Sequence, residues 1–202
     1  MKRILLAAMF FPLVVHPVQA AGVRSTNKAS SGNSIAEIQR NAEAGYADAQ
    51  LKLWAAYYSG EGVAQDKEKA VFWYQKAANQ GDAGAQFLLG RAYYLGDGVS
   101  QDYEKAVFWW QKSANQGIAD AQYNLGLAYY NGAGMPKSDE KAVFWYQKAA
   151  NQGYADAQLK LGAAYYFGKG VAQDKGTAHF WIQQAADKGN AKAKEYLSKL
   201  FN

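Results

Sequence analysis

The sequence contains no cysteine and only two histidines. The absence of cysteine excludes disulfides, thiol catalysis and metal sites built on thiolates. His16 lies in the apolar N-terminal stretch, and His179 has no second ligand at metal-binding spacing. The G-x-S-x-G, P-loop and H-E-x-x-H motifs are also missing. We therefore expect a non-catalytic protein with no metal site and no cofactor.

Strong charge of one sign is lacking as well. The formal net charge is +5, from 22 basic and 17 acidic residues in a chain of 202. The basic residues are spread along the sequence, whereas nucleic-acid-binding proteins usually carry a clustered basic stripe. We therefore expect no nucleic acid among the partners. Hydrophobic residues make up 50% of the chain and aromatic residues 15%, which is typical of an ordered domain.

The N-terminus has the layout of a secretory signal peptide. A short basic start, Lys2-Arg3, precedes a mostly apolar run from Ile4 to Val15, and small residues follow before Ala21. An uncleaved membrane anchor is the alternative, but a spanning helix needs roughly 20 apolar residues. We expect cleavage before Ala21, no stable membrane insertion afterwards and a periplasmic or secreted bacterial protein.

These patterns divide the N-terminal part into two segments, a signal peptide at residues 1–20 and a linker at residues 21–33. The linker is rich in Ser, Thr, Asn and Gly and has almost nothing to bury, so we expect it to be flexible.

The rest of the chain is dominated by one recurring stretch. KAVFWYQKAANQG begins at Lys69 and returns unchanged at Lys141, and variants of it begin at Lys105 and Thr177. Positions 69, 105, 141 and 177 are 36 residues apart each time. A fixed period of this size predicts a solenoid of stacked helical repeats, in which no unit buries its own apolar face alone.

Each repeat is expected to form two helices, A and B. In the first repeat, helix A runs from about Ala47 to Ser59, and Gly60 ends it. Asp66 caps helix B, and Ser138 stands at the capping position of the third repeat. The solenoid spans residues 34–202, with full repeats at 45–80, 81–116, 117–152 and 153–188 and half-repeat caps at 34–44 and 189–202. One large residue per repeat should fill the space between helices: Trp73, Trp109, Trp145 and Trp181.

The repeat follows the pattern A-x-x-x-L-G-x-A-Y-x-x-G-x-G-V, then D-x-x-K-A-x-x-W-Y-x-K-A-A-x-x-G. This pattern resembles the Sel-one-like repeat family, relatives of the tetratricopeptide repeats. It is carried in the second repeat by Ala85, Leu89, Gly90, Ala92, Tyr93, Gly96, Gly98, Val99, Asp102, Lys105, Ala106, Trp109, Ala114 and Gly117. The resemblance implies an all-α, right-handed α/α solenoid of antiparallel helix pairs that binds other proteins. Trp54 departs from the pattern, because the other repeats have glycine there, and close helix approach in the first repeat is therefore in question.

The resemblance also narrows the range of expected functions. Secreted bacterial members look like adaptors, regulators of envelope complexes, host-factor binders or immunity proteins against antibacterial toxins, including phospholipases. Our most concrete hypothesis is an immunity protein, and the alternatives are an adaptor or regulator of an envelope or signalling complex, or a secreted host-factor binder. A glycan or peptidoglycan binder is a minor alternative. The β-lactam binding linked to some cysteine-rich relatives is not carried over, because this chain has no cysteine.

In related repeats helix A lines the concave face, so the outward positions of helix A are the candidate binding surface. Aromatic residues and arginine are typical interface anchors. The alternative is that these aromatic residues only pack neighbouring repeats. The candidates are Tyr58, Phe87, Arg91, Tyr94, Tyr123, Leu127, Tyr130 and Tyr166.

Overall fold

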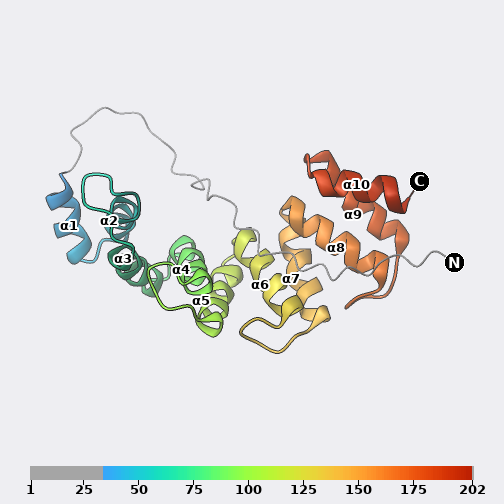
Figure 1. The fold of residues 1–202 in the computed structure, drawn as a ribbon, viewed down its shortest axis with the longest axis horizontal. Coiled ribbons are helices and arrows are strands. Elements are labelled where there is room, and N and C mark those ends of the chain that lie inside the picture. Colours follow the sequence, from blue (N-terminus) through green and yellow to red (C-terminus); the bar gives the residue numbers. More distant parts are fainter. Residues whose placement is uncertain (1–33, 202) are drawn as a thin grey trace. The chain divides into compact units, whose positions relative to one another are not determined.

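The computed structural model describes residues 34–201, and the predicted signal peptide and linker lie outside the described residues. The described part contains ten helices and no strand, arranged one after another along the chain (Figure 1). The helices are α1 (Ile35–Glu43), α2 (Ala47–Ser59), α3 (Lys67–Asn79), α4 (Ala83–Leu95), α5 (Tyr103–Asn115), α6 (Ala119–Asn131), α7 (Asp139–Asn151), α8 (Ala155–Phe167), α9 (Lys175–Asp187) and α10 (Ala191–Leu200).

Each helix packs against its neighbours in sequence, and the strongest packing joins α2 to α3, α4 to α5, α6 to α7 and α8 to α9. These four hairpins are the A and B helices of the four repeats, while α1 and α10 pack at the two ends. The structure therefore confirms an all-α solenoid of consecutive helix pairs.

The helix ends are set by local residues, as the sequence predicts. Gly60 ends α2 in the left-handed conformation, with φ at 80°, a conformation that costs glycine little. The Asp66 side chain accepts a hydrogen bond from the backbone N–H of Lys69 at 2.9 Å and caps α3. At α7 the hydroxyl of Ser138 accepts from the N–H of Lys141 at 3.2 Å. Ser138 thus caps α7 in place of aspartate, as expected from its position.

The core combines small residues with large ones. Leu53, Leu89, Leu125 and Leu161 have no exposed surface, and Trp73, Trp109 and Trp145 are each 7% exposed. Trp181 is only half-buried. Lysine side chains lie over Trp109 and Trp145, whereas α9 has Gln184 at that position.

Glycine within helix A allows close approach of helix B. A methyl group on Gly126 would come within 2.6 Å of the Tyr146 ring, and the equivalent glycines of the second and fourth repeats are equally crowded. The first repeat has Trp54 here instead, and its ring lies beside that of Tyr74 with centroids 4.5 Å apart. The first hairpin therefore packs through two aromatic rings where the others use a glycine.

Glycine also sets the contact between successive repeats. Gly134, in the loop between α6 and α7, has φ at 71°, and a side chain on it would collide with the backbone of Tyr103 at the start of α5. Gly98 and Gly170 make the same approach to the first residues of α3 and α7. In the second, third and fourth repeats, the second glycine of the Gly-x-Gly loop is thus required for docking on the preceding repeat as well as for the turn.

A ladder of buried glutamines joins the repeats. Gln86, 4% exposed, donates from Nε2 to the carbonyl of Ala78 at 3.1 Å. Its Oε1 accepts from Nε2 of Gln116 at 2.8 Å, and Gln116 also donates to the carbonyl of Gly81. The same bonds recur around Gln50 and Gln122. We name these residues the glutamine ladder: Gln50, Gln86, Gln122 and Gln158, with Gln80, Gln116 and Gln152 as their partners.

Candidate protein-binding surface

The candidate surface is the outward side of α2, α4, α6 and α8, which we call the A-face. Its most regular feature is a tyrosine in the last turn of each A helix. Tyr58 is 36% exposed, and the equivalent tyrosines are half-buried: Tyr94, Tyr130 and Tyr166.

These four tyrosines lie at the junction between helix A and the start of helix B. The Nζ of Lys67 is 5.9 Å from the Tyr58 ring centroid, and the Tyr94 and Tyr103 rings are 5.0 Å apart. Lysines likewise lie over the other two rings, at 5.4 Å for Tyr130 and 5.7 Å for Tyr166. Each tyrosine therefore packs within its hairpin and still presents part of its ring to solvent.

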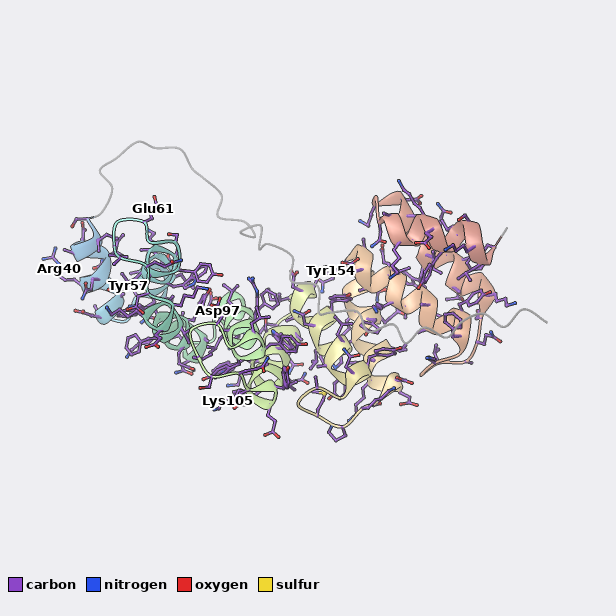
Figure 2. The ribbon with its side chains drawn as sticks, in the orientation of Figure 1. Arg40, Tyr57, Glu61, Asp97, Lys105 and Tyr154 are labelled. Atoms are coloured by element: carbon purple, nitrogen blue, oxygen red, sulfur yellow. The ribbon has the colours of Figure 1, made fainter. Side chains whose placement is uncertain are left out.

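A polar cluster lies beside Tyr58, where the first and second repeats meet. Asp97, labelled in Figure 2 in the loop after α4, forms an ion pair with Lys67 at 2.8 Å. It also accepts a hydrogen bond from the Tyr58 hydroxyl at 3.4 Å. The bond to Asp97 raises the pKa of Lys67, so this lysine stays charged. The cluster ties two repeats together and leaves a charged rim around the tyrosine.

Arg91 on α4 adds a cation close to this cluster. Its side chain is half-buried, and its Nε is buried without a hydrogen-bond partner. Burial raises the pKa of the neighbouring Tyr74, while the positive charge of Arg91 opposes that rise. The part of the guanidinium that remains accessible is suited to a charge-assisted bond with a carboxylate.

Two of the predicted residues are buried. Tyr123 and Leu127 on α6 are each 2% exposed, so neither belongs to the accessible surface of the chain. The Tyr123 ring lies 6.0 Å from the Tyr146 ring and 5.1 Å from the Tyr154 ring. Phe87 is partly buried against the cluster around Leu125. The role of all eight residues in binding stays a prediction, and those with accessible surface are Tyr58, Phe87, Arg91, Tyr94, Tyr130 and Tyr166.

The sequence analysis did not select Lys67 or Asp97 as candidates. A signal for them is present, because both positions change from repeat to repeat within an otherwise constant frame. The position of Lys67 holds Tyr, Asp and Lys in the later repeats, and that of Asp97 holds Glu, Ala and Lys in the others. Positions that the stack does not require are free to serve a partner.

The described residues contain no group of three or more His, Asp or Glu side chains placed to hold a metal ion. Among the helices α1 to α10, none is long and apolar enough to cross a membrane. His179, the histidine within the described part, is exposed and lies against the Phe201 ring, with centroids 4.9 Å apart. Nothing in this part of the chain positively indicates an enzymatic activity.

The Sel1 repeat model matches four consecutive segments, residues 47–82, 83–118, 119–154 and 155–190. These segments have the predicted period and begin two residues after the predicted boundaries. No curated protein matches the chain.

Solved structures share the fold. A protective antigen of uropathogenic Escherichia coli with an SLR fold is 38% identical, over 79% of this chain and 34% of the other, with a TM-score of 0.75. A Sel1 repeat protein from Oxalobacter formigenes is 38% identical, over 82% of this chain and 48% of the other, with a TM-score of 0.74. This chain thus spans between a third and a half of their lengths.

Cysteine-rich protein B of Helicobacter pylori is 27% identical, over 68% of this chain and 99% of the other, with a TM-score of 0.53. The helix pairs, the period and the four matched segments agree, and the chain belongs to the Sel1 repeat family.

Proposed function

We propose that this chain is a non-catalytic solenoid that binds another protein through the A-face. The observation that carries the proposal is the row of partly exposed tyrosines, beside positions that differ between otherwise nearly identical repeats. Tyrosine gives a large contact area at low entropic cost, and interfaces are enriched in it. The repeating frame builds the surface, and the varying positions give it specificity.

The second repeat supplies the central anchors. Arg91 and Tyr94 lie one turn apart on α4, and Tyr94 packs against Tyr103 and Trp110, with ring centroids 5.0 and 5.4 Å away. This packing holds the ring in place before a partner arrives, which reduces the entropy lost on binding. Arg91 would pair with a carboxylate of the partner.

In its most concrete form, the proposal is an immunity protein that neutralises a secreted antibacterial toxin, such as a phospholipase effector. Two features support it. The signal peptide predicted for residues 1–20 would deliver the chain to the periplasm, where such a toxin acts. A solenoid would also act by covering a surface of its partner, and covering an active site is sufficient to block an enzyme. An adaptor in an envelope complex would use the same A-face.

The binding surface is tested by pull-down from envelope and culture fractions with the wild-type chain, Arg91→Ala and Tyr94→Ala. Alanine is native at the position of Arg91 in the first and fourth repeats, as Ala55 and Ala163, so Arg91→Ala should fold normally. Each change should weaken the interaction at least about tenfold. Asn115→Ala, at an exposed position on helix B and outside the A-face, is the matched control. Partner recovery that is unchanged by Arg91→Ala and by Tyr94→Ala would contradict binding through the A-face.

The role of the interaction is tested by deletion of the gene and co-culture with toxin-secreting sister cells. An immunity protein predicts growth inhibition, which the wild-type chain relieves and Arg91→Ala relieves poorly. Unchanged growth together with loss of an envelope complex would identify an adaptor and reject the immunity role.

A further inference from the structure

Each helix B carries an exposed phenylalanine that the fold does not bury. Phe72, Phe108, Phe144 and Phe180 are 52, 51, 54 and 53% exposed, and they occupy the same position on α3, α5, α7 and α9. Each ring packs edge-on against the tryptophan that follows it, with centroids 5.0 to 5.1 Å apart. We call these four residues the Phe row. Its rings are fixed in orientation and half in solvent.

Charges flank the Phe row in a constant order. On α5, Glu104 stands four residues before Phe108 and Lys112 four residues after it, and all three are exposed. The Nζ of Lys112 lies 4.7 Å from the Phe108 ring centroid. Residues four apart share one helix face, so one face of α5 carries an acid, an aromatic ring and a base, in that order from its N-terminus to its C-terminus. We call such a set of three residues a strip. The same order surrounds Phe72 and Phe144, whereas α9 has Gly176 and Gln184 beside Phe180.

Exposed large apolar side chains on a soluble protein usually stand singly, whereas here one recurs at the same position of four successive B helices, so the position is a candidate contact site. The flanking charges indicate the occupant. Each complete strip has one acid and one base, so an anionic membrane or nucleic acid would meet glutamate as often as lysine. A second strip of the same sequence in the opposite direction would place every acid opposite a base.

Two-fold symmetry provides that arrangement. When two copies meet face to face, the axis lies in the interface, and each copy uses the same patch. With the axis across α5 at Phe108, the two α5 helices are antiparallel, Phe108 meets its own counterpart, and Glu104 lies opposite Lys112 of the second copy. With the two-fold axis parallel to α5 instead, the facing helices would be parallel, and the glutamate of one copy would lie opposite a glutamate of the other. The order of charges therefore favours the first arrangement.

We propose that the Phe row is the docking surface for a second copy of this chain, in an antiparallel dimer with two-fold symmetry. The contact is on helix B, so it leaves the A-face free for another protein. The dimer would present two A-faces to partners, and its test is independent of the proposed function.

Sedimentation equilibrium of the full chain tests the proposal. The wild type should form a dimer at rising concentration, and Phe108→Asp should weaken it at least roughly tenfold. Phe167→Asp is the control, since Phe167 is 54% exposed and lies outside the Phe row. A wild type that stays monomeric, or a dimer that Phe108→Asp does not weaken, overturns the proposal.

Charge reversal gives a sharper test. Glu104→Lys should weaken the dimer roughly tenfold, and Glu104→Lys with Lys112→Glu should restore it. The two residues are eight positions apart, about 12 Å along the helix, so they do not pair within one chain. Thermal unfolding of each variant checks that α5 still folds. A double reversal no better than the single one contradicts the dimer.

Anionic phosphatidylglycerol vesicles test the rival occupant. The chain should not bind them through the Phe row. Vesicle binding that Phe108→Asp abolishes, by a chain that stays monomeric, would replace the dimer with a lipid surface.

Discussion

At the residue scale, the buried glutamines connect three segments of the chain at once. Gln86 bonds to the end of the preceding helix, and Gln116 bridges it to the start of its own repeat. The ladder stops at its last member. Lys188 stands where the earlier repeats have glutamine, and the Oε1 of Gln158 is buried with no hydrogen-bond partner. A buried acceptor without a donor lowers stability.

Lys188→Gln should therefore stabilise the protein. The new amide would donate to Gln158, as Gln152 donates to Gln122 at 2.8 Å, and raise the free energy of unfolding by about 1 kcal/mol. Urea denaturation measures the change. Lys188→Met removes the same charge without adding a donor, so it should not stabilise the chain. Equal gains from glutamine and methionine would show that the ladder bond is not the cause.

At the element scale, the start of helix B allows a comparison within one molecule. Asp102 caps α5 by accepting from the N–H of Lys105 at 2.9 Å, and Ser138 caps α7 in the same geometry. The hydrogen bond from the Lys105 backbone, and then its side chain, lower the pKa of the Asp102 carboxyl. The charged aspartate cap thus stabilises α5 at pH values above the ordinary aspartate pKa. This contribution is lost as the pH falls through the lower pKa that Asp102 has in the folded state.

Asp102→Ser should keep the cap and remove its pH dependence. The wild type should be more stable than this variant near neutral pH, and the difference should shrink as the pH falls below about 4. Melting temperatures at several pH values measure it. Ser138→Asp, the reverse change in α7, should add the same pH dependence. A constant difference between the wild type and Asp102→Ser across this range would contradict the prediction.

Elements were predicted closely because their signals are local. The sequence predicts α2 from Ala47 to Ser59 and the structure has these bounds, since a glycine turn and an apolar period suffice to define them. Exposure on the A-face was less predictable. Phe87 and Tyr123 occupy the same position in successive repeats, yet Tyr123 is buried and Phe87 half-buried, because burial depends on the residues that surround each position.

The glutamine ladder was missed for a related reason. A polar side chain in a helix is normally assigned to the solvent side, and only the contact between repeats shows that Gln86 is buried and hydrogen-bonded through both its Nε2 and its Oε1. The recurrence of glutamine at this position was the available signal.

At the scale of the whole molecule, the array makes the cost of a cavity depend on its position. Leu53 and Leu125 are both fully buried, in the first and third repeats. Truncation of either to alanine should cost roughly 2–5 kcal/mol locally. Leu125→Ala should destabilise the whole array, because it weakens interfaces on both sides, whereas Leu53→Ala should mainly open the first repeat.

Hydrogen exchange read along the chain separates the two outcomes. Leu53→Ala should leave protection in α6 and α7 close to that of the wild type, and Leu125→Ala should reduce protection in every repeat. Equal, uniform loss of protection in both variants would show that the chain unfolds as a single cooperative unit.

The collision of a Gly134 side chain with the Tyr103 backbone has an evolutionary consequence. The joint between repeats depends on a bare backbone meeting a helix start, and that joint is nearly the same along the described array. Unequal recombination within the gene would therefore insert or delete whole units and leave a sound joint behind. Lineages with more or fewer units would arise easily, and selection would then act mainly on the reach of the binding surface.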